Sequence, residues 1–429
     1  MTAEQINKIL GISESFKMPE TLMQIVLDDD RRDMVMDEFM QIGESLDHDW
    51  FTEYFEEQHS NKTKMAQDFT PRGVSDLLSY IIGKPKTIAD VCAGTGGLTI
   101  AQWDKNNESK FYCYELSERA IPLLLFNLSI RNMRATVIRM NILTDERYEA
   151  YEVKPSDVYS HVTQCECPFI FDTVDAVVSN PPYSQKYDPK ADDRFPQFKD
   201  MLPTNFADFV FVAFSLSILN DGGKMGFVLP HGILFRGAKE KAFRQKLIES
   251  GLVKSVIGLP DKLFLNTGIP VLILEIDTSG ASTDVLFVDA SQECLKDGKL
   301  NILDEEHLNT IIGAIKLRRD IERFAKVATL EEIKENDFNL NISRYVDTYV
   351  PEPYPDFGEL MNDLATIQRE IYETQKELFR QTAQLVGTTQ EAERTFANGI
   401  KEYVDILNNG EASYRKEVTQ IESDRHHKI

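Results

Sequence analysis

The sequence comprises 429 residues, of which 42% are hydrophobic and 27% are charged, which is typical of a globular protein rather than a disordered chain. The net charge of −23 is opposite to the basic footprint of proteins that bind duplex DNA unaided, so a nucleic-acid substrate would require a partner that supplies positive charge, or a local basic groove. We expect no secretory signal in Met1–Phe16, no disulfide framework from five scattered cysteines and no membrane span, and therefore a reduced cytoplasmic protein.

The first predicted region, residues 1–60, is acidic and helical. Met34, Met36, Phe39, Met40 and Ile42 recur at roughly helical spacing, and the aromatic residues between Trp50 and Phe55 continue the pattern. The segment is interpreted as a small helical cap without chemistry of its own.

The second predicted region, residues 61–350, alternates short β-rich runs with helical patterns. The expected strands are Thr87–Val91, Lys110–Tyr114, Ala135–Arg139, Thr173–Ser179, Lys224–Leu229, Val253–Gly258 and Val271–Ile276. Helices are expected over Ser117–Asn132 and over the nearly apolar run Phe206–Leu219, which is too short to span a bilayer. This alternation predicts a Rossmann-like, doubly wound α/β sheet.

The third predicted region, residues 351–429, begins with a proline-rich linker at 351–355 and continues as helices. Leucine and isoleucine fall at heptad-like steps: Leu360, Leu364, Ile367, Ile371, Leu378 and Leu385. A second helix is expected over Glu391–Asn408, ending before Gly410. The apolar stripe has two interpretations, a coiled coil with a partner or a hairpin that packs on itself.

A glycine-rich turn follows the first expected strand. Its candidate ligand-binding residues are Asp90, Ala93, Gly94, Thr95, Gly96 and Gly97. Glycines permit a tight turn and close ligand approach, although many such turns bind nothing. Glu115 ends the next strand, where a carboxylate can accept both ribose hydroxyls of a nucleoside; it could also be only a helix N-terminal acid. Together the two features favour a nucleoside cofactor.

The sequence Asn180-Pro181-Pro182-Tyr183 follows the apolar strand that ends at Ser179. Two prolines fix the backbone and remove its donors, which leaves an Asn carbonyl, the main-chain carbonyl of Pro181 and an aromatic ring. Two acceptors can hold the hydrogens of a conjugated amine and stabilise positive charge that develops on its nitrogen, while the ring can stack on a flipped base. A rigid turn without function is the alternative interpretation.

These motifs resemble motifs I and IV of the amino-methyltransferases, and Gln67–Arg72 resembles the preceding motif of gamma-ordered adenine enzymes. By this resemblance, Gln67, Phe69, Thr70 and Pro71 hold the methionine end of S-adenosyl-L-methionine, and Asn180 also contacts the cofactor. Further runs resemble type I modification subunits: Asp193–Pro196, Gly222–Lys224, Val228–Arg236, Ile257–Pro260, Leu263–Phe264, Thr267–Pro270 and Asn339–Tyr345. The resemblance therefore implies a class I methyltransferase fold and methylation of adenine N6 in duplex DNA.

The same resemblance implies partners, namely DNA, a specificity subunit, a second copy of this chain and a restriction subunit. Asn141 stands where adenine enzymes often carry an Asp beside the cofactor's adenine. Phe235 and Arg236 are candidates for contact with the target base or DNA, whereas His231 is interpreted as structural or DNA-contacting because the chemistry needs no strong base. The pair Cys165 and Cys167 lacks a second ligand pair, so no metal is expected.

Two other functions are compatible with parts of this pattern. Asn-Pro-Pro-Tyr also occurs in methyltransferases that act on protein glutamine amides or RNA bases, which the Gln67–Arg72 motif and the heptads disfavour. An inactive cofactor-binding assembly subunit is the second alternative, and the intact Asn180, Pro181 and Tyr183 disfavour it. The chain has no Walker-type phosphate loop and is therefore not expected to be the motor subunit.

Overall fold

A computed structural model describes residues 2–43, 45–51, 54, 70–168, 171–186, 194–198, 200–203, 205–265, 267–280, 282–349, 356–382 and 384–406. The chain divides into two compact units, Met1–Tyr349 and Val350–Ile429. The expected residues Gln67 and Phe69 lie outside the described residues.

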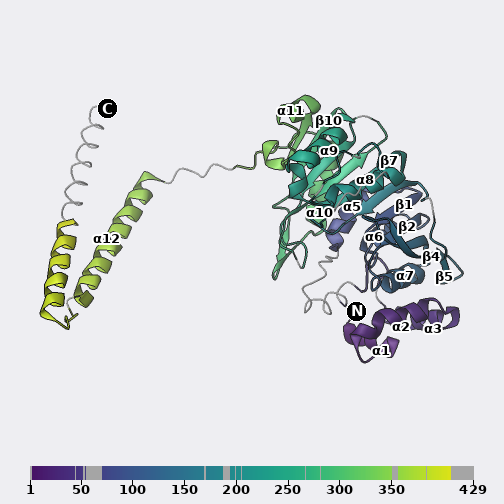
Figure 1. The fold of residues 1–429 in the computed structure, drawn as a ribbon, viewed down its shortest axis with the longest axis horizontal. Helices are drawn as coiled ribbons and strands as arrows, with labels where there is room; N and C mark the ends of the chain where they lie inside the picture. Colours follow the sequence, from purple (N-terminus) through teal and green to yellow (C-terminus); the bar gives the residue numbers. More distant parts are fainter. Residues whose placement is uncertain are drawn as a thin grey trace. The chain divides into compact units, whose positions relative to one another are not determined.

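A mixed sheet of 11 strands forms the centre of the first unit (Figure 1). Its strands are β1 (Thr87–Val91), β2 (Lys110–Glu115), β3 (Arg134–Asn141), β4 (Glu146–Lys154), β5 (His161–Cys165), β6 (Val174–Ser179), β7 (Leu219–Pro230), β8 (Val253–Gly258), β9 (Val271–Asp277), β10 (Asp284–Asp289) and β13 (Ala325–Thr329). Their spatial order is β13-β10-β8-β9-β7-β6-β1-β2-β3-β4-β5. Two further strands, β11 (Leu295–Asp297) and β12 (Leu300–Ile302), pair with each other.

The order of the parallel strands reverses direction between β1 and β6. From β1 the chain proceeds outward to β2 and β3 on one side, and β6 then returns to pair with β1 on the other side, in parallel. Val91 at the end of β1 is in register with Ser179 at the end of β6. Open α/β sheets bind ligands beyond the carboxyl ends of strands at such a switch point. The glycine-rich turn and Asn180 therefore leave the sheet side by side.

Helices cover both faces of the sheet, and each face has its own apolar core. The helices are α1 (Ala3–Leu10), α2 (Met18–Val26), α3 (Asp29–Met40), α5 (Arg72–Ile82), α6 (Gly97–Lys105), α7 (Ile121–Ile130), α8 (Asp208–Ile218), α9 (Ala238–Glu249), α10 (Glu305–Leu317) and α11 (Leu330–Glu335), with 3₁₀ turns at Ser15–Lys17, His231–Leu234 and Ile342–Arg344. Alternation along the strands separates the cores, since Ile88 of β1 faces α5 and α7 while Ala89 and Val91 face α8 and α9. The expected doubly wound α/β fold is confirmed.

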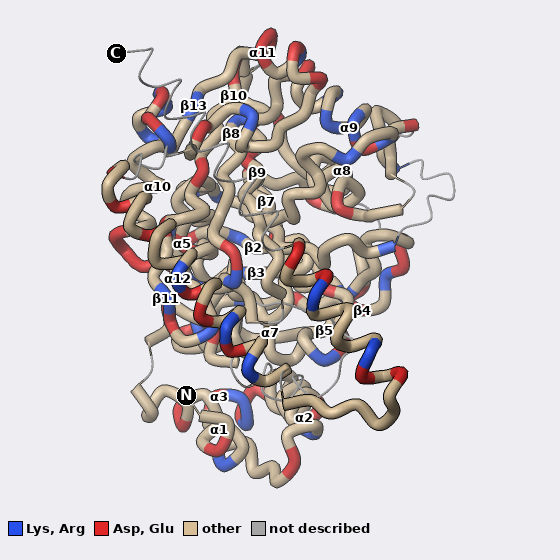
Figure 2. The backbone as a smooth tube through the Cα atoms, turned by 90° about the vertical axis from the view of Figure 1, so that its left-hand side faces the viewer, with Lys and Arg blue, Asp and Glu red and all other residues tan. Residues whose placement is uncertain are grey.

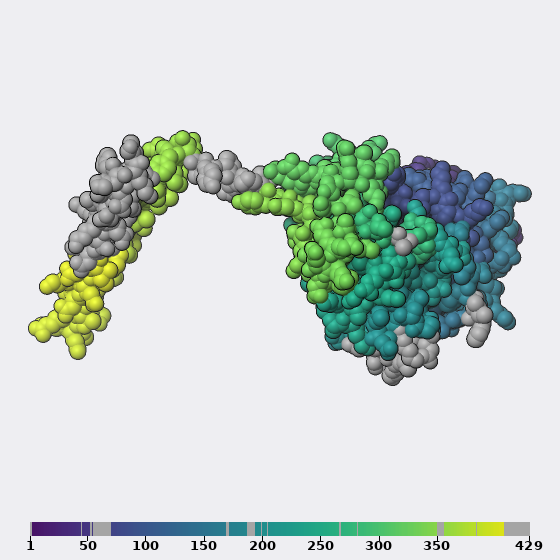
Figure 3. Space-filling model, turned by 90° about the horizontal axis from the view of Figure 1, so that it is seen from above, coloured from purple at the N-terminus to yellow at the C-terminus, as the bar shows by residue number. Residues whose placement is uncertain are grey.

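The N-terminal helices pack on α7 and share the first core. Phe39 of α3 lies 4.8 Å from Phe126 of α7 between ring centroids. In the space-filling view the blue and teal segments of the first unit form one continuous surface, behind which the purple N-terminal helices are mostly hidden (Figure 3). The expected periodicity is only partly right: α3 ends at Met40, Met34 is 63% exposed, and Trp50 and Phe51 belong to a turn rather than to a continuing helix.

Four strands of the large sheet were not expected from the sequence. β4 and β5 extend one side of the sheet as an antiparallel hairpin, and β10 and β13 extend the other side. β4 intersperses charged residues with its buried Ala150, Tyr151 and Val153, and β5 carries mostly exposed polar residues, so neither has the apolar run of an interior strand. The seven expected strands are all present, with ends shifted by at most a few residues except for the earlier start of β7.

The second unit consists of helix α12 (Phe357–Thr382) and a helix over 390–406. Within this unit the two helices contact each other through Phe379 and Tyr403, whose ring centroids lie 5.7 Å apart. Helix α12 buries none of its residues, and its stripe residues Leu364 and Ile367 are each 53% exposed. The expected helix end at Gly410 lies outside the described residues.

Positive and negative residues are mixed along the chain. In the backbone trace of Figure 2, Lys and Arg are interspersed with Asp and Glu. Among the described residues, no helix is long and apolar enough to cross a membrane.

Candidate active site at the carboxyl ends of the parallel strands

A cavity of about 790 Å³ opens at the carboxyl ends of β1, β2, β3 and β6. Its lining includes Thr70, which precedes α5, and predicted site residues from every one of these strand ends, namely Ala93, Gly94, Thr95, Gly97, Glu115, Asn141, Asn180, Pro181, Pro182 and Tyr183. Apolar side chains that include Leu98, Ile142 and Phe211 complete its wall. The fold therefore brings together residues from five separate segments of the sequence in one cavity.

The glycine-rich turn is tied to the end of β2. The backbone amides of Cys92 and Ala93 both donate to the carbonyl of Tyr114, at 2.9 and 3.0 Å. Gly96 requires its glycine for two reasons: its φ is +100°, and a Cβ there would lie 2.8 Å from Cδ1 of Leu124. The turn thus packs closely on α7 and begins α6 at the cavity wall.

Asp90 lies beneath this turn rather than in the cavity. Its side chain is fully buried, and one carboxylate oxygen accepts from the backbone amide and the hydroxyl of Thr99, at 3.1 and 2.6 Å. Burial raises the pKa of Asp90 to about 7, although the bonds from Thr99 favour the charged form. The contacts of Asp90 join β1 to the first turn of α6, which stabilises the shape of the turn.

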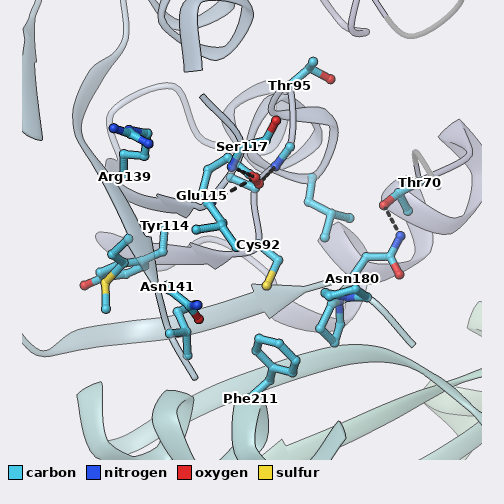
Figure 4. A pocket seen from close by; sticks show the side chains of 18 of the residues that line it. Thr70, Cys92, Thr95, Tyr114, Glu115, Ser117, Arg139, Asn141, Asn180 and Phe211 are labelled. Carbon is cyan, nitrogen blue, oxygen red and sulfur yellow. Dashed lines mark hydrogen bonds between the residues drawn. The ribbon is translucent and has the colours of Figure 1, made fainter. Parts of the chain in front are cut away.

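Glu115 points its carboxylate at the turn. One oxygen accepts from the amide of Gly94 at 2.7 Å, and the other accepts from the amides of Leu116 and Ser117 at 2.9 and 2.7 Å. The residue is only 4% exposed, yet it lines the cavity (Figure 4). Three backbone donors hold the carboxylate in one orientation, as a ribose-binding acid requires.

Asn180 lies between two hydroxyl groups. Its amide nitrogen donates to Oγ1 of Thr70 at 3.0 Å, and its amide oxygen accepts from the hydroxyl of Tyr183 at 2.7 Å (Figure 4). Thr70 precedes α5, so the motif that contains it meets the Asn180 loop directly. These two bonds set the orientation of the amide.

A buried acid anchors the far end of this loop. Asp208, at the start of α8, accepts from the amide of Ser184 at 2.9 Å and from Arg236 at 2.8 Å. Arg236 also contacts Glu240 and the ring of Phe206, and Phe235 is 52% exposed outside the cavity. Arg236 therefore supports the loop indirectly, through its bond to Asp208, and Phe235 lies on the surface.

Asn141 forms the end of β3 in the cavity wall. Its oxygen accepts from the amide of Leu143 at 3.0 Å, which leaves the amide nitrogen as the group's donor. Arg194 supports this turn, because it donates to the carbonyls of Ile142 and Leu143 at 2.8 and 3.3 Å. The run Asp193–Pro196 was singled out by its resemblance, but this supporting role of Arg194 was not expected.

Two further expected residues lie away from the cavity lining. Pro71 is the N-cap of α5 and makes no side-chain cap hydrogen bond. His231 donates its Nε2 proton to the carbonyl of Val271 at 3.2 Å, and burial lowers the pKa of this histidine, both of which fit a structural role. Among the described residues, no group of three or more His, Cys, Asp or Glu side chains could hold a metal ion.

Asp49 is a lining residue that the sequence did not predict. It belongs to the N-terminal region, for which no chemistry was expected, and it accepts hydrogen bonds from Thr95 and from Asn127, the latter at 2.7 Å. A single acid in a turn has no motif around it. The sequence feature that could have indicated Asp49 is the neighbouring aromatic pair Trp50 and Phe51, because their burial holds the turn against the core.

The fold and this cavity together define the chain as a class I methyltransferase-like protein: a mixed, doubly wound sheet with its cavity at the switch point between β1 and β6. The family model of the N-6 DNA methylases matches residues 48–352, and the chain belongs to this family. The matched span begins beside Asp49 and ends at the linker.

Individual relatives agree with this assignment. The chain is 30% identical over 349 residues to the type I restriction enzyme MjaVIII methylase subunit of Methanocaldococcus jannaschii, an alignment of 76% of this chain and 57% of the relative. It is 28% identical over 329 residues to the type I restriction enzyme MpnII methylase subunit of Mycoplasma pneumoniae, covering 72% and 58%. The chain thus spans less than two thirds of the length of these relatives.

A solved structure shows the same likeness. The type I restriction-modification system methyltransferase subunit of Streptococcus thermophilus superposes with a TM-score of 0.60 at 32% identity, covering 69% of this chain and 62% of the other. The expected resemblance to type I modification subunits is confirmed by these matches.

Proposed function

We propose that this chain transfers a methyl group from S-adenosyl-L-methionine to N6 of adenine in duplex DNA, as the modification subunit of a type I restriction-modification complex. The observation that carries the proposal is one shared cavity. The Asn180–Tyr183 loop, which suits an exocyclic amine, lines the same cavity as the glycine-rich turn and Glu115, which suit a nucleoside cofactor.

The residues present fit this cofactor. A cavity of about 790 Å³ is within the range of small-molecule sites. Glu115 would accept the ribose hydroxyls, and the amide nitrogen of Asn141 would donate to a ring nitrogen of the adenine edge. Phe211 and Ile142 supply apolar surface for the ring, and the turn at Gly94–Gly97 lets the cofactor's tail approach the backbone. The bound cofactor supplies an electrophilic methyl group on a sulfonium.

Asn180 and Pro181 would hold the amine of the target adenine. An amide oxygen has two lone pairs, so Asn180 can accept from Tyr183 and from the amine together. The main-chain carbonyl of Pro181 is the second acceptor, and both stabilise the positive charge that develops on N6. The ring of Tyr183 would stack on a base extruded from the duplex.

The exposed stripe of α12 supports a role in a larger complex. Six apolar side chains of the second unit are exposed at heptad-like spacing: Leu360, Leu364, Ile367, Ile371, Leu378 and Leu385. We propose that this stripe packs on a specificity subunit, which reads the DNA site for two copies of this chain and, in the full complex, for a restriction subunit. Delegated recognition also accounts for a net charge of −23 in a DNA-modifying chain.

Modification-sensitive long-read sequencing of the native host's DNA tests the proposal, with the intact gene compared with an Asn180→Ala allele. The native host keeps partners present. Loss of N6-methyladenine from one two-part motif would support the chemistry, the substrate and the delegated recognition. Persistence of every methylated motif, with expression of the intact gene verified, would contradict DNA as the substrate and favour a protein glutamine or an RNA base.

A further inference from the structure

The turn that carries Asp49 is held rigidly on the catalytic core. Arg131 of α7 is 3% exposed and donates to the main-chain carbonyls of Leu46, at 2.7 Å, and of His48. The guanidinium also lies 5.4 Å from the ring centroid of Trp50. Burying an arginine is costly unless its donors are satisfied. The bonds from Arg131 to these carbonyls therefore hold the N-terminal turn in a defined position on α7.

From this position, the carboxylate of Asp49 is aimed at the glycine-rich turn. One oxygen accepts from the amide of Asn127 at 2.7 Å and from the backbone amide of Phe51 at 2.9 Å, and the other accepts from the hydroxyl of Thr95. Asn127 donates in addition to the carbonyl of Thr95 at 2.9 Å. The carboxylate is thus oriented before any ligand binds, and it lines the cavity.

The proposed cofactor carries a cationic α-ammonium on its tail, which needs an acceptor in a partly enclosed site. Among the residues that the structure describes, the carboxylates that line the cavity belong to Asp49, Glu115 and Glu118. Glu115 bonds to Gly94 at the end of β2, on the ribose side, and Glu118 is exposed beyond it. Asp49 differs from both because it accepts from the side chain of Thr95, inside the glycine-rich turn.

Thr70 lies close to the same turn. A Cβ built on Gly97 would lie 4.0 Å from the main-chain oxygen of Thr70, and Thr70 bonds to Asn180, near which the methyl group would be delivered. A cofactor held by Glu115 at its ribose and directed toward Asn180 would bring its tail to the turn at Thr95–Gly97. Asp49 bonds to Thr95 in that turn and would therefore be within reach of the tail.

We propose that Asp49 accepts the α-ammonium of the cofactor, so that the N-terminal segment completes the cofactor site of the catalytic domain. This inference rests on the proposed function. It assigns binding of the cofactor to a region that the motif pattern leaves outside the catalytic machinery. Cofactor affinity would then depend on the position of residues 46–51 on α7.

The test measures dissociation constants by calorimetry on the full chain with two ligands. One is S-adenosylhomocysteine, and the other is its desamino analogue, in which hydrogen replaces the α-ammonium. We expect the native protein to prefer S-adenosylhomocysteine by about tenfold or more, as a charge-assisted hydrogen bond implies. Asp49→Asn should remove this preference by weakening only the first ligand, to within about twofold of the analogue.

Asp47→Asn is the matched control. Asp47 lies in the same turn and pairs with Arg72, but it does not line the cavity, so the variant should keep the native preference. An equal loss of affinity for both ligands in Asp49→Asn would overturn the proposal, because it would show that Asp49 only shapes the turn.

If Asp49→Asn fails to fold, the affinities of the native protein for the two ligands still test the proposal. Equal affinity of the native protein for the two ligands would overturn the role of Asp49 while leaving the proposed function intact. If the native protein bound neither ligand, the proposed function would fail together with this inference.

Discussion

The two units of this chain differ in how far their apolar residues are buried. The first unit buries them in two cores, one on each face of the sheet, and holds the walls of its cavity with hydrogen bonds to backbone groups. Helix α12 of the second unit buries none of its residues. Under the proposed function, this difference suits a first unit that binds a small ligand and a second unit whose apolar stripe is covered by a partner.

The most direct way to break this comparison is to delete residues 357–429. We expect complete loss of association with the specificity subunit in co-purification from the native host. Affinity for S-adenosylhomocysteine should stay within about twofold, because the deleted helix contributes no buried residue. A truncated chain that still co-purifies would show that assembly depends on the first unit, and the contrast between the units would fail.

Asn180→Ala should separate chemistry from binding within the first unit. We expect methylation of DNA by the assembled complex to fall by about 10²–10³-fold or more, the scale of a lost group that stabilises developing charge. Cofactor affinity should change by no more than a few-fold, because Asn180 bonds to Thr70 and Tyr183 rather than to the glycine-rich turn. Co-purification with partners should be unchanged. Equal losses of cofactor binding and methylation would assign Asn180 to the cofactor instead.

The contrast also explains which features could be predicted from sequence. The interior strands β1 and β6 are short apolar runs, and the motifs that follow them meet because the sheet order reverses between them. Parallel pairing thus converts two distant sequence motifs into neighbours, so one correct fold class placed Glu115 and Asn180 in one cavity.

Most of the features that were missed have a physical reason; strand β10 is the exception, because its residues Val285–Val288 form a buried apolar run. The hairpin β4–β5 lies at the edge of the sheet, where one polar face removes the apolar run that identifies a strand. Asp49 and Arg194 act through hydrogen bonds across the tertiary structure, to Thr95 and to the carbonyls of Ile142 and Leu143. Such contacts show no characteristic spacing in the sequence, because they depend on where two remote turns meet in the fold.

Glu115→Ala should weaken binding of S-adenosylhomocysteine by about 1–3 kcal/mol, the scale of lost charge-assisted hydrogen bonds. Glu118→Ala is the control, since Glu118 also lines the cavity but is exposed and lies away from the turn. It should change the affinity by less than about 0.5 kcal/mol. An unchanged dissociation constant for Glu115→Ala would argue against the ribose contact and would weaken the view of the first unit as a preformed nucleoside site.

The smallest expected effect concerns Thr70, whose hydroxyl accepts from the amide of Asn180 at 3.0 Å. Thr70→Val keeps the size of the side chain and removes this acceptor, so the amide of Asn180 loses one of the two bonds that orient it. We expect kcat for methylation to fall by about 3–30-fold, the scale of one hydrogen bond of about 0.5–2 kcal/mol. Thr70→Ser retains the hydroxyl and should recover most of the rate. If Thr70→Val instead weakens binding of S-adenosylhomocysteine as much as it lowers kcat, the hydroxyl serves the cofactor rather than the orientation of Asn180.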